Sequence, residues 1–249
     1  MAVRWLSALL DFPADQFSTE VTFWRAIAGS TVSPPYGPNN EFASLEPFNG
    51  DPHLMVQRVQ DGPGGVHLDL HVDDFDTAVA RAQELGAQLQ TSTADLAVLR
   101  SPAGFAFCLA EWHGQDERSR PIRWPGDTIS IIDQLVIDVP GHAYDTETAF
   151  WADLTQWPAN DAGEPGFRRL DHPNNITLRL LLQRVETGQI GAHLDLASTH
   201  PEDEVTRHEG WGAIVVKHYP HWTVMADPMG REYCITHRNP RTGKLLSGE

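Results

Sequence analysis

The chain has 249 residues, of which 41% are hydrophobic and 21% charged, as in an ordinary globular protein. Its 34 acidic residues outnumber 18 basic ones, which gives a formal net charge of −16 at pH 7. The sequence contains no basic stripe, so nucleic acid is excluded as a partner, and neutral or cationic small molecules are favoured. No apolar run approaches the roughly 20 residues that span a membrane. The short run after Arg4 is too brief for a signal peptide. We expect no membrane association and a cytoplasmic location.

The chain contains the same sequence pattern twice, 126 residues apart. Gly65–Leu70 reads Gly-Val-His-Leu-Asp-Leu, and Gly191–Leu196 reads Gly-Ala-His-Leu-Asp-Leu. The same offset relates Cys108 to Cys234, and nearer the start an offset of 127 relates Phe23-Trp24 to Phe150-Trp151. Because this period is far longer than a solenoid repeat, it predicts two whole domains. We place them at residues 1–113 and 128–238, with a polar linker at 114–127 and a tail at 239–249.

The first copy predicts strands and helices in alternation. Polar and apolar residues alternate around Leu6–Asp11, which indicates a strand. A helix follows with Asp15 or Ser18 as its cap and Gly29 as its stop, and Asp74 caps a second helix that ends at Gly86. The remaining strands are expected at Glu41–Pro47, His53–Val59, Val66–Val72, Leu96–Arg100 and Phe105–Glu111.

The second copy predicts the same order. Helices are expected from Asp145 to about Leu154 and over Glu202–Trp211. The strands are expected at Ile131–Val139, Phe167–Leu170, Ile176–Val185, Ala192–Ala197, Trp222–Ala226 and Arg231–Thr236. The fold class is therefore α+β, with two βαβββ-like units in each copy.

Three features together resemble a known superfamily. They are the Phe-Trp pair in the first helix, the His-Leu-Asp-Leu strand that leads into a capped helix, and the final hairpin, Ser101–Leu109 or Asp227–Ile235. This combination is similar to the glyoxalase/bleomycin-resistance/extradiol-dioxygenase (vicinal oxygen chelate) superfamily, in particular its tandem glyoxalase-like proteins. The resemblance covers nearly the whole chain twice. It implies paired βαβββ modules whose sheets curl into a cup.

The resemblance also implies where a metal would bind. Metal-dependent members carry ligands on the first strand, on the strand before the histidine strand, at the histidine itself, and as a glutamate on the last strand. These positions fall at Ser7 and Gln134, Gln57 and Gln183, His67 and His193, and Cys108 and Cys234. Only the histidine matches the family pattern in either copy.

The donor types argue against a metal. Gln and Ser are poor ligands for divalent ions, and His with Cys makes only a two-ligand site. Asp69 shares a strand face with His67, but residues i and i+2 are separated by roughly 6.5–7 Å along a strand, which is awkward for sharing one ion. We therefore predict no metal and no other cofactor. A divalent metal is the less favoured alternative.

A polar pocket floor is the expected site in each copy. His67 with Asp69, and His193 with Asp195, would supply proton transfer or hydrogen bonds. Residues that would contact the ligand are Ser7, Gln57, Cys108, Gln134, Gln183 and Cys234. The competing interpretation is that these groups only satisfy one another inside a packed sheet. Both cysteines are more typical of small buried hydrophobes than of nucleophiles, and Trp24 and Trp151 of core residues.

Three functions follow from these observations. The first is binding of a small hydrophobic or aromatic molecule, as in drug or metabolite sequestration. The second is an enzyme, a lyase, isomerase or dioxygenase, that is either metal-dependent with unusual ligands or metal-free with His/Asp acid–base chemistry. The third is a structural role for one degenerate cup, with the second copy as the candidate. A monomeric pseudo-dimer and a homodimer are both compatible with the duplication.

Overall fold

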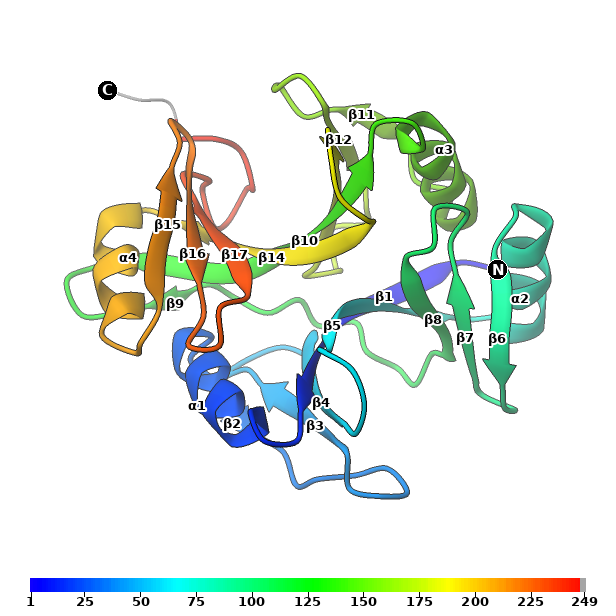
Figure 1. The fold of residues 1–249 in the computed structure, drawn as a ribbon, viewed down its shortest axis with the longest axis horizontal. Helices are drawn as coiled ribbons and strands as arrows, with labels where there is room; N and C mark the ends of the chain where they lie inside the picture. The colour runs from blue at the N-terminus through cyan, green and yellow to red at the C-terminus, as the bar shows by residue number, and fades with distance from the viewer. Residues whose placement is uncertain (247–249) are drawn as a thin grey trace. The chain divides into compact units, whose positions relative to one another are not determined.

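The computed structural model describes residues 1–246 and confirms two βαβββ modules in the first copy (Figure 1). In chain order the first module contains β1 (Val3–Pro13), α1 (Phe17–Ile27), β2 (Thr31–Val32), β3 (Phe42–Glu46) and β4 (Leu54–Val59). The second contains β5 (Gly65–Val72), α2 (Phe75–Glu84), β6 (Gln88–Ser92), β7 (Leu96–Arg100) and β8 (Ala106–Glu111).

The second copy repeats this order after a short strand in the predicted linker, β9 (Ile122–Arg123), which pairs with β10. Its first module contains β10 (Ile129–Pro140), α3 (Tyr144–Thr155), β11 (Ala159–Asp161), β12 (Phe167–Leu170) and β13 (Arg179–Val185). Its second contains β14 (Gly191–Ser198), α4 (Pro201–Glu209), β15 (Ile214–His218), β16 (Trp222–Ala226) and β17 (Glu232–Thr236).

Each copy contributes one curled sheet. The first sheet has the order β2-β3-β4-β1-β5-β8-β7-β6, and the second the matching order β11-β12-β13-β10-β14-β17-β16-β15. The β5–β8 and β14–β17 pairs are parallel, whereas β7–β8 and β16–β17 are antiparallel hairpins. The strands in each of these orders come from one copy. The predicted fold class is confirmed.

The compact units of the chain combine halves of both copies. One unit contains residues 1–10, 65–118 and 135–192, and the other contains 11–64, 119–134 and 193–246. The first unit therefore holds α2 and α3, and the second holds α1 and α4. The boundaries predicted from the repeat follow the duplication of the sequence and stay a prediction.

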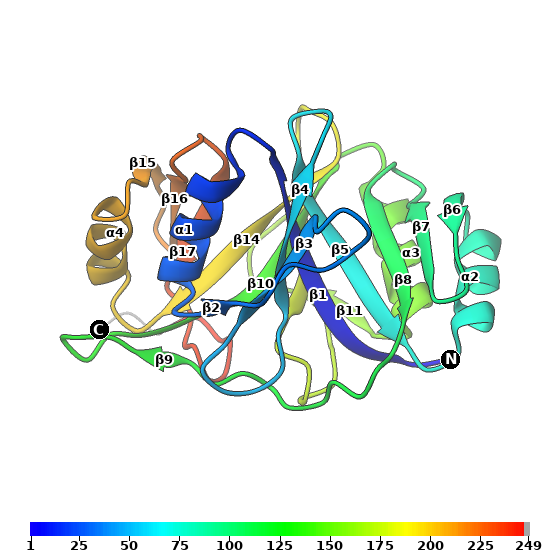
Figure 2. The same ribbon diagram turned by 90° about the horizontal axis from the view of Figure 1, so that it is seen from below.

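The first unit is built on an aromatic core between its two helices. Phe107 of β8 packs edge-on against Phe150 and Trp151 of α3, and α2 contacts α3 (Figure 2). The Arg81 side chain of α2 donates hydrogen bonds to the Asp153 carbonyl near the end of α3, with its Nη2 at 2.8 Å. A cation at a helix C-terminus satisfies a carbonyl that lacks a partner within the helix.

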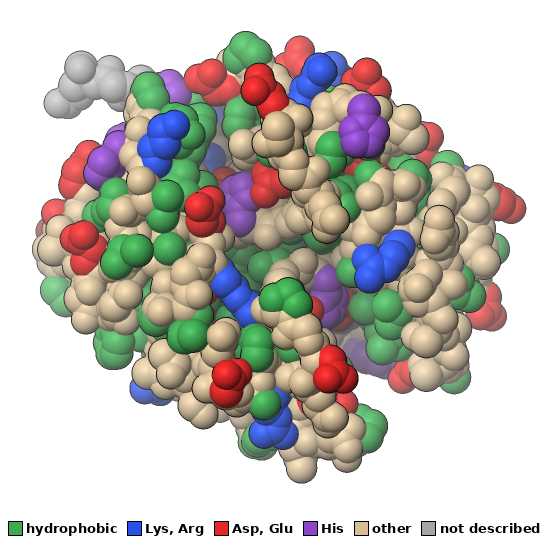
Figure 3. All heavy atoms as spheres, viewed as in Figure 1, with side chains coloured by type: hydrophobic (Ala, Val, Ile, Leu, Met, Phe, Trp, Pro, Cys, Tyr) green, Lys and Arg blue, Asp and Glu red, His purple; other side chains and the backbone are tan. Residues whose placement is uncertain are grey.

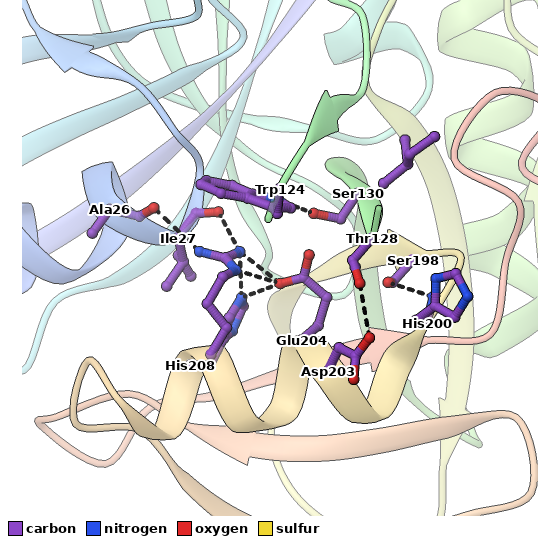
Figure 4. A network of polar contacts seen from close by, with 12 residues as sticks. Ala26, Ile27, Trp124, Thr128, Ser130, Ser198, His200, Asp203, Glu204 and His208 are labelled. Atoms are coloured by element: carbon purple, nitrogen blue, oxygen red, sulfur yellow. Dashed lines mark hydrogen bonds and ion pairs between the residues drawn. The ribbon is translucent and has the colours of Figure 1, made fainter. Parts of the chain in front are cut away.

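The second unit repeats this arrangement with more buried charge. Arg207, the equivalent of Arg81, donates to the Ile27 carbonyl of α1 at 3.0 Å and lies over the Trp124 ring at 3.7 Å. It also pairs with Glu204 at 2.6 Å, and His208 lies 3.3 Å from the same carboxylate (Figure 4). Glu204 and His208 are fully buried. Burial lowers the pKa of His208.

A buried glutamate in each unit accepts a hydrogen bond from the tryptophan one turn later. Glu147 accepts a hydrogen bond from Trp151 Nε1 at 2.8 Å, and Glu20 accepts one from Trp24 Nε1 at 3.2 Å. Opposite Glu20 the final hairpin carries Asp227, where the first copy has Ser101. Burial and the neighbouring Asp227 carboxyl raise the pKa of Glu20 to about 8. Both tryptophans are buried, as predicted.

The helix boundaries confirm some local predictions and correct one. Asp74 caps α2 by accepting a hydrogen bond from the Thr77 amide, and Gly86 follows that helix with φ +101°. Neither Asp15 nor Ser18 caps α1, because the cap is Gln16 and no side chain bonds to the helix end. The sequence also missed the edge strands β6 and β15, whose residues are mostly exposed and therefore lack a clear apolar face.

The helices of residues 1–246 are too short or too polar to cross a bilayer.

Replacing each arginine in turn separates the stability that comes from the buried ion pair from the stability that comes from the helix contact. We expect Arg207→Met to lower the free energy of unfolding by about 3 kcal/mol, because it leaves buried Glu204 without its closest cation. Arg81→Met is the matched control. It removes the same type of helix contact, but the first unit has Ala78 where the second has Glu204, so no buried carboxylate loses its cation. The free energy of unfolding should fall by only about 1 kcal/mol. Urea unfolding measures both, and equal losses would contradict this account.

The raised pKa of Glu20 predicts that stability falls with rising pH. In the unfolded chain this carboxyl titrates near 4.5, whereas in the folded chain it titrates near 8. Its contribution is therefore fully present below pH 4.5 and is lost, on the order of a few kcal/mol, as pH rises to 8. Urea unfolding between pH 5 and 8.5 should show a flatter profile for Glu20→Gln. An unchanged slope in this variant would refute the assignment.

Candidate functional site

Three potential ligand side chains converge in the first unit. His67 and Asp69 lie on β5, and Cys108 lies on β8, directly opposite Asp69 in the parallel register. One nitrogen, carboxylate oxygen or sulfur atom from each side chain lies within 4.8 Å of the other two. His67 Nε2 is 3.5 Å from Asp69 Oδ1, and the two side chains are 14% and 11% exposed. We call this group the first cluster.

The second unit contains the same arrangement. His193 and Asp195 lie on β14, and Cys234 lies on β17 opposite Asp195. Their donor atoms also lie within 4.8 Å of one another. His193 Nε2 is 3.6 Å from Asp195 Oδ1, with the side chains 16% and 7% exposed. We call this group the second cluster.

Strand geometry explains the convergence and corrects the sequence argument against it. His67 and Asp69 point to the same face because side chains alternate along a strand. Their backbones are separated along β5, as expected, but the long imidazole spans that separation and reaches the carboxylate. Cys108 enters from the neighbouring strand, about 4.8 Å away in a sheet. The spacing of i and i+2 therefore does not prevent these side chains from sharing one ion.

In the first unit, the Ser7 side chain contacts His71. Its hydroxyl lies 3.0 Å from His71 Nε2, and both side chains are buried. His71 follows Asp69 by two residues on β5, and burial lowers its pKa. The second copy has Ala197 at the equivalent position. The structure gives the first unit a second histidine on the strand face of the cluster.

Gln134 occupies the position of Ser7 in the second unit but bonds to the cluster itself. Its Nε2 donates a 2.8 Å hydrogen bond to Asp195 Oδ2. This contact fixes the carboxylate, which leaves Oδ1 on the side of His193. Gln134 therefore orients Asp195, and its predicted contact with a ligand stays a prediction.

The two other predicted glutamines belong to different compact units from the clusters with which they were grouped. Gln57 lies on β4 opposite Phe42, in the unit of the second cluster. Gln183 lies on β13 opposite Phe167, in the unit of the first cluster. Both side chains are partly buried. Their predicted contact with a ligand stays a prediction.

The thiols are reduced and buried. Neither Cys108 nor Cys234 forms a disulfide, and each is less than 9% exposed. Each lies on a strand rather than at a helix N-terminus, where a thiolate nucleophile would be favoured. The arrangement suits a thiol that acts as a ligand beside an imidazole and a carboxylate.

The surface carries the charge expected from the composition. Acidic side chains are spread over the face in view, and the lysines and arginines on it are scattered rather than gathered (Figure 3).

Comparisons with known proteins place the chain in a family. The model of the glyoxalase-like domain matches residues 7–110 and again residues 134–236. The chain belongs to the glyoxalase-like domain family. No curated protein matches it.

Solved structures share the fold at low sequence identity. The Mn(II)-bound glyoxalase from Novosphingobium aromaticivorans has a TM-score of 0.64 at 15% identity, over 98% of this chain and 86% of that one. 2,2',3-Trihydroxybiphenyl 1,2-dioxygenase from Sphingomonas wittichii has a TM-score of 0.60 at 16% identity, over 94% and 90%. A variant of homoprotocatechuate 2,3-dioxygenase from B. fuscum has a TM-score of 0.65 at 15% identity, over 98% and 73%. At such identities the likeness shows the fold alone.

The residues of this chain do not fit a manganese or iron site of the family pattern. Carboxylate, imidazole and water ligands suit those ions, whereas the family positions hold hydroxyl, amide and thiol groups apart from the histidine. The His-Asp-Cys clusters are a different donor set drawn from two adjacent strands. Any ion bound here would have to suit that set.

The glutamine contact can be tested through stability. We expect Gln134→Met to lower the free energy of unfolding by about 1–3 kcal/mol, because it removes a donor from a buried carboxylate. Gln183→Met, at a partly buried strand position, is the control and should change it by less than about 0.5 kcal/mol. Thermal unfolding of both variants measures the difference. Similar losses would show that Gln134 does not hold Asp195.

Proposed function

We propose that this protein binds a small hydrophobic or aromatic molecule at the two His-Asp-Cys clusters. The observation that carries the proposal is the recurrence of the cluster in both units with nearly equal geometry. The His-Asp separations are 3.5 Å and 3.6 Å, although the residues around them differ, as Ser7 and Gln134 do.

Partial exposure supports a binding role. The histidine side chains remain 14% and 16% exposed while the carboxylates are more deeply buried. An incoming molecule would therefore meet the imidazole before the carboxylate, and the buried groups would act in a medium where polar contacts are strong. The names of the dioxygenase neighbours refer to aromatic substrates, which makes aromatic molecules the first class to test.

An enzyme of the superfamily is the second candidate. The paired imidazole and carboxylate favour it, because a carboxylate that orients an imidazole is a common arrangement for proton transfer. In this alternative His67–Asp69 and His193–Asp195 act as acid–base pairs in a lyase, isomerase or dioxygenase reaction. Gln134 would then position the His193–Asp195 pair rather than touch the substrate.

A ligand screen by thermal shift tests the binding proposal. An aromatic ligand present at 100 times its dissociation constant should stabilise the protein by about 2.7 kcal/mol. The double variant His67→Gln/His193→Gln should abolish the shift. His142→Gln, at an exposed histidine outside both clusters, should retain it.

Two results would contradict the proposal. One is the absence of any shift across neutral, cationic and anionic aromatic compounds. The other is a shift of equal size in the wild type and in the double variant, since the ligand would then bind elsewhere.

A further inference from the structure

We infer that each His-Asp-Cys cluster binds a thiophilic divalent cation of the zinc class. The inference rests on the proposed function for the location of the site, and it adds an ion with which a small ligand would interact. The ligands are His67, Asp69 and Cys108 in the first cluster, and His193, Asp195 and Cys234 in the second. The histidines and cysteines stand at ligand positions of the family, but cysteine replaces the glutamate of the family, and Asp69 and Asp195 lie outside its ligand positions.

The chemistry of the donors selects the class of ion. Imidazole nitrogen, carboxylate oxygen and thiolate sulfur are the three donor types that zinc accepts, and sites with three protein ligands leave a position for water or a small ligand. Oxygen-preferring ions such as Mn²⁺ gain little from a thiolate. The clusters therefore favour zinc over the manganese that the Novosphingobium glyoxalase binds.

The spacing is compatible with one ion in each cluster. Zinc bond lengths of about 2.0–2.3 Å in a tetrahedron place neighbouring donors roughly 3.3–3.8 Å apart. The His67–Asp69 contact of 3.5 Å already lies in this range, and the His193–Asp195 contact of 3.6 Å does so as well. The donors of each cluster lie within 4.8 Å of one another. Side-chain rotations that move a donor atom by about 1 Å would bring all three into the range expected for one zinc ion.

The Asp69 carboxylate gives a second observation, because its only close contact at Oδ1 within residues 1–246 is His67 Nε2 at 3.5 Å. Its Oδ1 atom is buried, and it forms no hydrogen bond with the described residues. A buried carboxylate oxygen without such a bond is unfavourable, and such groups in native proteins call for an explanation, an unseen ion among them. Here that oxygen lies on the side of the histidine, where a cation would sit.

The second cluster shows the support that metal ligands usually have. Carboxylate ligands are commonly held by a further hydrogen bond that fixes their orientation. Gln134 supplies that bond to Asp195 Oδ2, while Oδ1 stays on the side of His193. The two clusters thus offer the same donors, one with its carboxylate fixed and one without that bond.

Zinc titration of the purified full chain tests the inference. The protein is stripped with a chelator, kept reduced, and titrated with Zn²⁺ against a chromophoric competitor without any organic ligand. We expect two equivalents per chain, with Mn²⁺ at least about tenfold weaker. Cys108→Ala and Cys234→Ala should each lose one equivalent, and the double variant should lose both.

Cobalt supplies a second measurement that does not depend on stoichiometry. Co²⁺ bound through a thiolate absorbs in the near ultraviolet by charge transfer. This band should halve in each single cysteine variant and vanish in the double variant. Asp69→Asn and Asp195→Asn keep the side-chain shape and should weaken zinc binding. These variants test the site even if the cysteine variants misfold.

The outcomes separate this inference from the proposed function. One equivalent or none in the wild type, or binding that persists in the double cysteine variant, overturns the zinc inference. If aromatic ligands still shift the melting temperature in that case, the proposed function survives. Two cysteine-dependent zinc ions without any ligand response would leave this site assigned and the small-molecule function refuted.

Discussion

The parallel pairing of β5 with β8, and of β14 with β17, is the constraint on which the site depends. It places Asp69 opposite Cys108 and Asp195 opposite Cys234. Alternation along the strand then puts each histidine on the same face as its aspartate. A shift of one residue in the register of either pair would turn the thiol to the other face of the sheet, away from the histidine and the aspartate. The register of the sheets therefore determines whether a site exists.

The helices belong to compact units that combine segments of the two copies. Each compact unit pairs a helix from one copy with a helix from the other, and an arginine from α2 or α4 satisfies the end of α3 or α1. The copies have diverged in what surrounds this contact. Unit 2 buries Glu204 with Arg207 and places Asp227 against Glu20, whereas the equivalent positions of unit 1 hold Ala78 and Ser101. The two units therefore share a scaffold but differ in the charge buried among their helices.

The sequence predicted the repeat, the module order and most of the inner strands, because buried strands and the Asp74 cap have strong local patterns. It missed β6 and β15, whose exposed residues have no apolar periodicity. For the site, it identified His67, Asp69 and Cys108 but took the spacing of His67 and Asp69 along the strand as awkward for sharing one ion. That judgement used backbone spacing alone, and only the structure shows the side chains turned toward one another and Gln134 bonded to Asp195. Registers across strands distant in sequence are not encoded in local patterns.

Zinc-edge X-ray absorption on the zinc-loaded protein is the most direct test of the His-Asp-Cys sites. The account predicts one sulfur scatterer at about 2.3 Å per zinc, together with nitrogen and oxygen scatterers at about 2.0–2.2 Å. The sulfur shell should disappear in the Cys108→Ala/Cys234→Ala protein. A zinc shell made of nitrogen and oxygen alone in the wild type would contradict the central claim.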